Sequence, residues 1–206
     1  ELCFFLEKMG VKIDGIGTTT LTVHGITSFN APLEYTNSED PIESMMFISA
    51  AITTHSKLTI TRAPIDFLSV ELLKLEKMGL KYKKTKRYKS HNGRTDLVDL
   101  TIMPSKLKAP ADKIHALPYP GINTDNLPFF VPIATQTEGT TLIHDWMWET
   151  RAIYFTELNR LGANVVLADP HRVFVTGKTK LKGAQVVCPP ALRPAMIILI
   201  AMLGAE

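Results

Sequence analysis

The chain has 206 residues, a net charge of +3, 45% hydrophobic residues and 21% charged residues, which is ordinary for a soluble globular protein. So weak a positive charge does not by itself indicate a nucleic-acid partner. Two cysteines, Cys3 and Cys188, without a CxxC pattern argue against a disulfide framework and a zinc site, and they fit a reducing, cytoplasmic setting. The longest apolar run, residues 195–203, is too short to span a bilayer, so no membrane partner is expected.

The amino-terminal residues have the composition of a helix end rather than of a protein start. Residue 1 is Glu, and the stretch LEKMG at 6–10 leads directly into the β-type run at 11–13. Residues 196–206 form an apolar helix pattern that stops without the strand that follows such helices earlier in the chain. We therefore expect the remainder of its own chain to be missing from this sequence.

A repeat explains why LEKMG occurs twice and a related LNRLG occurs once. The glycines that end these stretches are Gly10, Gly79 and Gly162, which lie 69 and 83 positions apart. Further pairs of segments share the spacing of 83, namely 56–60 with 139–143 and 46–52 with 129–135. An offset shared by several blocks indicates an internal structural repeat.

One repeat begins with two different helix patterns. Residues 42–52 are apolar nearly all round, which predicts a helix buried on every side. After a half-buried strand at 57–61, residues 66–78 show an amphipathic pattern that should end at Gly79 as a C-cap. Its apolar stripe is Leu68, Leu72, Leu75 and Met78, and its polar side is Glu71, Lys74 and Lys77.

Each repeat ends with a β-hairpin pattern. Strands at 80–86 and 96–102 flank the turn sequence SHNGR, in which Asn-Gly is a hairpin signature. In the third copy the stripe of Tyr154, Leu158 and Leu161 precedes strands at 165–167 and 172–176. With a strand before it, each unit reads βαβαββ. The helices are predicted to be buried, and the strands are predicted to have one solvent-exposed face. This pattern predicts helices inside and sheets outside, the inverse of the common α/β arrangement.

The segment HALPYPGINTDNLPFF at 115–130 contains the first candidate site residue. Asp125 stands at a proline-rich entry to a buried helix, where a carboxylate could accept a proton or bind a hydroxyl. The pattern Thr-Asp-Asn is also a good helix N-cap, and from the pattern alone the cap is favoured.

Two arginines are candidates for binding an anion. Arg151 starts the amphipathic helix of the third copy and could clamp a carboxylate or phosphate, or it could pair with Glu149. Arg193 precedes an apolar helix, where its charge opposes the helix dipole unless an anion is bound. The basic residues of 81–94 fit a solvated hairpin better than a nucleic-acid site. The histidines show no metal-binding spacing, so no metal is expected.

Four segments together resemble the UDP-N-acetylglucosamine 1-carboxyvinyltransferase (enolpyruvyl transferase) family. They are NTDNLPFF, EGTTLIHDWMWETRAIYFTELNRLGANV, GAQVVCPPALRPA and DPIESMMFISAAI. The resemblance implies an inside-out α/β barrel built of βαβαββ repeats. Residues 1–38 would end a first enolpyruvyl transferase domain and 39–206 would form most of the second.

The resemblance also implies an activity. Members of the family transfer enolpyruvyl from phosphoenolpyruvate to the 3′-hydroxyl of UDP-N-acetylglucosamine, the first committed step of peptidoglycan synthesis. The reaction takes place in the cytoplasm and needs no cofactor. By resemblance, Asp125 is the base that contacts the sugar hydroxyl, and the Met147 backbone contacts the sugar nucleotide. Arg151 and Arg193 line the anion-binding cleft.

The sequence departs from the family pattern at an important position. Ala191 stands where the family has the aspartate of its Asp-Leu-Arg motif, so we expect the parent protein to be slow or inactive. Asp145 and Glu149 are the candidates to replace that carboxylate. The family's cysteine loop, amino-terminal lysine and carboxyl-terminal arginine lie outside this chain, which should not be active alone.

Three alternatives remain open at this point. One is a 3-phosphoshikimate enolpyruvyl transferase, which resembles this fold but acts on a different substrate. Another is a non-catalytic paralogue, which would account for Ala191. The third is an RNA 3′-phosphate cyclase, also built of βαβαββ repeats, which would use the basic run at 81–94.

Overall fold

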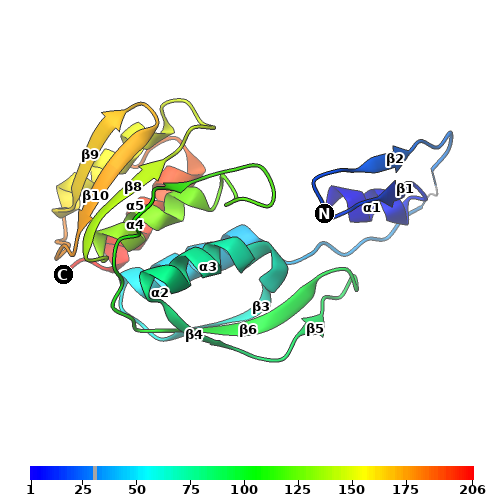
Figure 1. Ribbon diagram of the computed structural model, residues 1–206, viewed down its shortest axis with the longest axis horizontal. Helices are drawn as coiled ribbons and strands as arrows, with labels where there is room; N and C mark the ends of the chain where they lie inside the picture. Colours follow the sequence, from blue (N-terminus) through cyan, green and yellow to red (C-terminus); the bar gives the residue numbers. More distant parts are fainter. Residues whose placement is uncertain (30–31) are drawn as a thin grey trace.

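The computed structural model describes residues 1–29 and 32–206; residues 30–31, inside the range 1–38 expected to end a first domain, lie outside the described part. A small amino-terminal piece is followed by two sheets with helices between them (Figure 1). None of the described helices has the length and apolar character needed to cross a membrane.

The amino-terminal piece consists of one helix and one hairpin. Helix α1 (Leu2–Lys8) leads into strands β1 (Lys12–Asp14) and β2 (Thr22–His24), which pair antiparallel, and β1 overlaps the β-type run expected after LEKMG. The piece lies to one side of the main body (Figure 1). It contacts the main body through an ion pair of 2.9 Å between Glu7 and Arg94.

The first unit of the main body contains a sheet with the strand order β3-β6-β4, and β5 also pairs with β6. Its elements are α2 (Pro41–Thr53), β3 (Leu58–Pro64), η1 (Ile65–Leu68), α3 (Ser69–Met78), β4 (Lys81–Lys84), β5 (Tyr88–Lys89) and β6 (Asp96–Met103). All four residues of the predicted apolar stripe are buried. Gly79 ends α3 with a φ of 111°, a left-handed conformation that favours glycine.

The second unit repeats this plan, and its four-stranded sheet has the order β7-β8-β10-β9, with β7 at the edge next to β8. Its elements are β7 (Ile114–His115), η2 (Leu127–Phe129), α4 (Phe130–Thr135), β8 (Gly139–His144), η3 (Arg151–Leu161), β9 (Asn164–Asp169) and β10 (Arg172–Gly177), and α5 (Leu192–Leu203) follows. The predicted hairpins of both units are confirmed. β7 pairs with β8 in parallel.

The amphipathic helix predicted for the third copy is a 3₁₀ helix, η3. Its buried apolar residues are Ala152, Phe155, Leu158 and Leu161, so Phe155 takes the place predicted for Tyr154. The spacing of three between them matches the three residues per turn of a 3₁₀ helix. The sequence pattern at 158 and 161 fits both periods, which is why the α-helical reading was wrong.

The core lies where three apolar helices meet between the sheets. α2 packs against α4, α5 and β3, and α4 packs against β8 and β10 (Figure 1). α4 is buried along its whole length. α2 is not buried on every side as predicted, because Glu43 and Phe47 are exposed. Both sheets are open, and the described residues form no closed barrel, so the structure supports mixed α/β layers with helices between sheets.

Candidate functional site

Three of the predicted site residues line one cavity of about 310 Å³ at the start of α5. The lining residues are Asp125, Trp148, Arg151, Ala191, Leu192, Arg193 and Pro194. They come from three separate segments: the loop before η2, the segment from β8 into η3, and the first turn of α5. The fold therefore brings together side chains that are up to 69 positions apart in the sequence.

Asp125 faces the two arginines and does not cap a helix. Its Oδ1 lies 3.7 Å from Arg151 Nη1 and its Oδ2 lies 3.6 Å from Arg193 Nη2. The N-cap of η2 is Asn126, without a side-chain cap bond, so the cap interpretation of Asp125 is wrong. The Asn123 side chain instead accepts the Asp125 backbone N–H at 2.8 Å, which shapes the turn.

Arg151 is held rigidly by a buried carboxylate and a backbone carbonyl. Its Nε and Nη2 donate to the two oxygens of Asp145 at 2.5 and 2.9 Å, and Nη2 also donates to the Thr124 carbonyl at 2.8 Å. Arg151 is only 7% exposed. The two-pronged contact fixes the plane of the guanidinium, so Nη1 is the nitrogen directed toward Asp125. No pair with Glu149, the alternative partner expected from the sequence, is found in the described part of the chain.

Arg193 lies in the first turn of α5, beside backbone amides that no side chain caps. Ala191 is the N-cap of α5 in an extended conformation and makes no side-chain cap bond. The Nε of Arg193 is buried and makes no hydrogen bond within residues 1–29 and 32–206. A cation at a helix N-terminus is electrostatically unfavourable unless a negative group is nearby. Asp125 supplies such a group, with its Oδ2 3.6 Å from Arg193 Nη2, which is longer than a hydrogen bond.

Asp145 does not replace the missing carboxylate at position 191. It is fully buried, and both of its oxygens are engaged by Arg151. Burial raises the pKa of Asp145, while the hydrogen bond and charge of Arg151 oppose that shift. Glu149, the other candidate, is exposed and does not line the cavity. The role of Asp145 is to hold Arg151.

Glu71 is a supporting residue that the sequence pattern placed wrongly. It was predicted on the exposed side of α3, but it is 2% exposed. Its Oε1 accepts the Asn126 side-chain amide at 2.8 Å and the Asn123 backbone N–H at 3.2 Å. Glu71 thus reaches from the first unit into the loop that carries Asp125. Helix periodicity does not reveal this contact, because the second unit covers that side of α3.

The segment between β8 and η3 adds an aromatic wall. The Trp148 ring lies 5.5 Å from the Arg151 guanidinium carbon, within the range of a cation–π contact. Trp146 donates its ring N–H to the Ala116 carbonyl at 2.6 Å. Met147, between them, is exposed and does not line the cavity. The sequence analysis did not single out Trp148, and nothing in the Trp-Met-Trp stretch indicates which ring faces the arginine.

The cavity combines one carboxylate with two guanidinium groups and an uncapped helix start. The guanidinium groups and the helix amides suit a carboxylate or phosphate. The carboxylate, set between them, can accept a proton from a hydroxyl group. The basic run at 81–94 lies far from this arrangement in the sheet of the first unit. There Arg87 and Lys89 pair with Asp96, as a solvated hairpin does.

Comparison with known proteins identifies the relatives of this chain. The family model described as EPSP synthase (3-phosphoshikimate 1-carboxyvinyltransferase) matches residues 1–206. Proteins named UDP-N-acetylglucosamine 1-carboxyvinyltransferase from Treponema denticola and Bradyrhizobium diazoefficiens are 35% and 33% identical over 98% and 100% of this chain. The chain spans 46% of each of these relatives.

Solved structures show the same relationship. The enolpyruvyl transferase NikO from Streptomyces tendae matches 99% of this chain and 46% of its own with a TM-score of 0.73 and 25% identity. EPSP synthase from Acinetobacter baumannii matches 98% of this chain and 47% of its own with a TM-score of 0.74 and 18% identity, which shows the fold alone. The resemblance drawn from the sequence is thereby confirmed over the whole chain. This chain belongs to the EPSP synthase-type enolpyruvyl transferase family and is a relative of the UDP-N-acetylglucosamine 1-carboxyvinyltransferases.

Proposed function

We propose that this chain forms part of an enolpyruvyl transferase that joins phosphoenolpyruvate to the 3′-hydroxyl of UDP-N-acetylglucosamine. The observation that carries the proposal is the meeting of Asp125, Arg151 and Arg193 around one cavity. The names of the relatives support the sugar-nucleotide acceptor over shikimate 3-phosphate. The reaction belongs to cytoplasmic peptidoglycan synthesis in this proposal.

Each residue has a part in the proposed chemistry. Asp125 accepts the proton of the sugar 3′-hydroxyl, and the oxygen of that hydroxyl forms a bond to C2 of phosphoenolpyruvate. Arg151 and Arg193 hold the anionic groups of phosphoenolpyruvate, and they stabilise the charge that builds up in the tetrahedral adduct. The Met147 backbone contacts the sugar nucleotide. As the new C–O bond forms, the C2=C3 electrons take a proton at C3 from a group outside this chain, which gives the tetrahedral adduct. C3 then gives up a proton as the bond from C2 to the phosphate oxygen breaks, so the double bond is restored and phosphate leaves.

The proposal includes the domain arrangement that the sequence suggested. Residues 1–38 end one enolpyruvyl transferase domain, and 39–206 form most of a second, inside-out α/β domain. The separate position of the α1 piece and the placement of helices between two sheets support this division (Figure 1).

A second candidate function rests on Ala191. A methyl group lines the cavity where the family pattern has a carboxylate, and neither Asp145 nor Glu149 takes its place. A member of the family that binds UDP-N-acetylglucosamine without turnover would have such a wall.

The test is phosphate release from phosphoenolpyruvate and UDP-N-acetylglucosamine by the complete protein that contains this chain. Asp125→Asn should lower turnover by about 10²–10⁴-fold, the usual contribution of a positioned proton acceptor. Asp112→Asn, an exposed aspartate outside the cavity, is the matched control and should leave turnover unchanged. Equal turnover in wild type and Asp125→Asn would remove Asp125 from the mechanism.

The same assay separates the two candidate functions. Turnover by the wild type supports the transferase. Calorimetric binding of UDP-N-acetylglucosamine without phosphate release supports the binding protein, and in that case Ala191→Asp should raise turnover. Release of phosphate with shikimate 3-phosphate but not with the sugar nucleotide would contradict both.

A further inference from the structure

The chain between β8 and η3 leaves the second unit and returns to it within six positions. Asp145 is fully buried, residues 146–150 are exposed, and Arg151 is only 7% exposed. Arg151 donates two hydrogen bonds to the carboxylate of Asp145, at 2.5 and 2.9 Å. The backbone must therefore turn back immediately before Arg151, and the conformation of residue 150 determines the direction in which the arginine side chain leaves the chain.

Thr150 makes this turn in a left-handed conformation, with a φ of 60° and a ψ of 0°. Its carbonyl accepts the Ile153 N–H at 3.2 Å, which begins the turn into η3. In this conformation the Cβ of an L-residue lies too close to the following carbonyl oxygen, and a β-branched residue is rarely found there. The side chain of Thr150 makes no cap hydrogen bond to η3. The backbone strain at Thr150 is therefore not compensated by a cap.

The first unit passes from its strand to its second helical segment without such a turn. At the offset of 83, Thr150 corresponds to Phe67, which lies inside η1 and does not have a positive φ. Strand β3 runs to Pro64 and η1 begins at the next residue, so no loop separates them. The strain at Thr150 is therefore specific to the second unit and is not required by the shared order of elements.

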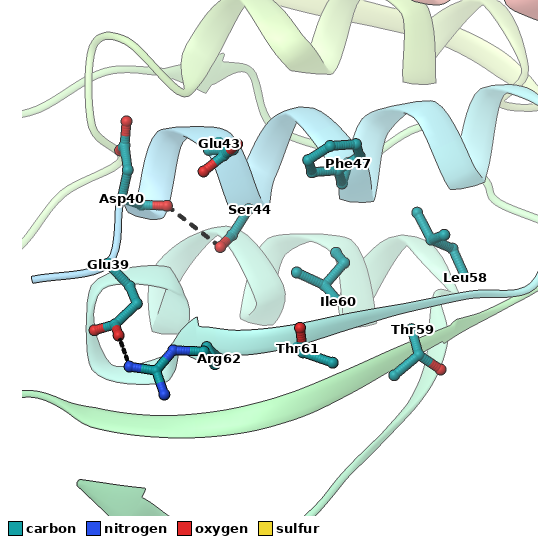
Figure 2. A pocket seen from close by; sticks show the side chains of 10 residues that line it. All are labelled: Glu39, Asp40, Glu43, Ser44, Phe47, Leu58, Thr59, Ile60, Thr61 and Arg62. Carbon is teal, nitrogen blue, oxygen red and sulfur yellow. Dashed lines mark hydrogen bonds and ion pairs between the residues drawn. The ribbon is translucent and has the colours of Figure 1, made fainter. Parts of the chain in front are cut away.

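The residue of the first unit that corresponds to Asp145 also has a different partner. It is Arg62, which lines a groove of about 400 Å³ between α2 and β3 and pairs with Glu39 (Figure 2). Arg62 has a φ of 61° of its own, within an irregularity of β3 where Asp99 accepts its N–H at 3.1 Å. Its ion-pair partner comes from the segment before α2. The strained turn thus occurs in the unit where the ion pair joins the end of the strand to the start of the following helix.

Contacts on both sides hold Thr150 in place. Before it, the Trp146 ring N–H donates to the Ala116 carbonyl at 2.6 Å. After it, Arg151 binds the buried Asp145. Strained backbone conformations persist where surrounding contacts over-determine them, and they are concentrated at active sites. Hydrogen bonds between charged groups are stronger than those between neutral groups, so the Asp145–Arg151 pair is the main contact that holds the turn.

We propose that Thr150 is a positioning residue of the candidate site. Its left-handed turn directs the guanidinium of Arg151 to Asp145 and to the cavity, and the Asp145–Arg151 pair in return keeps the turn closed against the strain. Asparagine adopts the left-handed conformation at a lower cost than threonine. An asparagine at position 150 should therefore keep the turn closed even where the ion pair is weakened. The strain itself is independent of the proposed function, on which only the binding of phosphoenolpyruvate depends.

The first measurement is the exchange of the Arg151 Nε–H with solvent, followed by NMR in the complete protein that contains this chain. Because this proton is bonded to Asp145 Oδ2, it exchanges when the turn opens. Thr150→Asn should slow the exchange by about tenfold. Thr150→Val keeps the branched Cβ and should leave the exchange unchanged. Thr22→Asn, at an exposed threonine without a positive φ, is the matched control and should also leave it unchanged.

The second measurement is the affinity for phosphoenolpyruvate in the Asp145→Asn background. There the ion pair no longer holds the turn, and the apparent affinity falls with the fraction of molecules in which the turn is closed. Adding Thr150→Asn should recover about fivefold or more of the lost affinity, whereas adding Thr150→Val should recover none. With Asp145 intact the turn is already closed, so Thr150→Asn should change the affinity by about twofold or less. A residue that only stabilised the fold would not show this dependence on Asp145.

Three results would each overturn the proposal. They are equal exchange of the Arg151 Nε–H in Thr150→Asn and wild type, equal slowing of that exchange by Thr150→Val, and no recovery of affinity by Thr150→Asn in the Asp145→Asn background of a protein whose wild type binds phosphoenolpyruvate. Failure of the wild type to bind phosphoenolpyruvate would contradict the proposed function instead, and the exchange measurement would then decide the role of Thr150 alone.

Discussion

The two units of the main body share one order of helices and strands but have different polar residues at equivalent positions. Both have an inner helix, a strand, a second helical segment and a hairpin, in that order. In the second unit the residue after the strand, Asp145, is fully buried and binds Arg151. In the first unit the position at the offset of 83 is Arg62, which is partly exposed and pairs with Glu39. The charge is thus reversed at this one equivalent position.

This difference shows how the same order of elements forms a candidate site in the second unit and an open groove in the first. In the second unit the long loop from 116 to 126 separates β7 from the inner helix and carries Asp125 toward the start of α5. In the first unit β3 pairs with β6 on one side, no described strand pairs with its other side, and no such loop precedes the inner helix. Its equivalent region is a groove. The shared helices and strands determine where charged residues can lie close together, and the loops determine whether those residues line a cavity.

The largest effect is expected from breaking the buried ion pair of the second unit. Asp145→Asn removes the charge that compensates a nearly buried guanidinium, and it should lower the free energy of unfolding by about 3–5 kcal/mol. The matched change in the first unit is Glu39→Gln. Because Arg62 there is 40% exposed, that change should cost about 1 kcal/mol or less.

Urea unfolding of the two variants measures this difference. Equal losses of unfolding free energy in the two variants would show that another negative group compensates Arg151. The ion pairs of the two units would then not differ in the way proposed. In the complete protein, Asp145→Asn should also impair binding of phosphoenolpyruvate, which a purely structural role of the pair would leave unchanged.

A smaller effect is expected from the contact that joins the two units. Glu71→Ala leaves the Asn126 side-chain amide and the Asn123 N–H without their buried acceptor, and it should cost about 1–3 kcal/mol. Glu76→Ala is the control, an exposed glutamate of the same helix, and surface changes of this kind stay within about 0.5 kcal/mol. Glu71→Gln retains an acceptor oxygen and should recover part of the loss.

The measurement is again urea unfolding, together with hydrogen exchange in the Asp125 loop. Glu71→Ala should speed exchange there, and Glu76→Ala should not. If both variants behave alike, Glu71 does not position the loop.

Periodic features were predictable from the sequence because they follow from local geometry. The stripe from Leu68 to Met78, the left-handed Gly79 and the hairpin turn at Asn92 each depend on neighbours a few positions away. Asp125, Arg151 and Arg193 were candidates from the sequence pattern, the resemblance gave them roles, and the structure brings them to one cavity. Their roles in catalysis remain predictions.

Features set by distant segments were not predictable. Glu71 has the spacing of a solvent-facing residue, and only the loop of the second unit explains its burial. Phe47 has the spacing of a core residue, but the described strands leave it open. Arg151 and Asp145 are six positions apart across a turn, a separation that no regular element brings together. In each case the deciding partner lies outside the window that a local pattern describes.

The smallest effect concerns acid stability, where the two units should respond with opposite sign. In the first unit the Tyr88 hydroxyl donates to Asp99 at 2.6 Å and the Arg62 N–H donates at 3.1 Å, and these hydrogen bonds hold the pKa of Asp99 below its ordinary value of 3.8. The unfolded chain then binds more protons than the native chain at acid pH. The stability that Asp99 provides is therefore present above about pH 4 and is lost as the pH falls through its native pKa.

The pKa of Asp145 is shifted the other way by burial, so in the window above 3.8 the native state binds the extra proton. Its contribution to stability falls as the pH rises through that window. Asp99→Asn should thus make the unfolding free energy less dependent on pH below about 4, because it removes the group that is protonated only on unfolding. Urea unfolding at about pH 5 and about pH 3 should show a gap between wild type and Asp99→Asn that narrows at the lower pH. A gap that stays constant would mean that the Tyr88 and Arg62 contacts do not favour the ionised carboxylate, and the opposite behaviour of the two units would be refuted at this position.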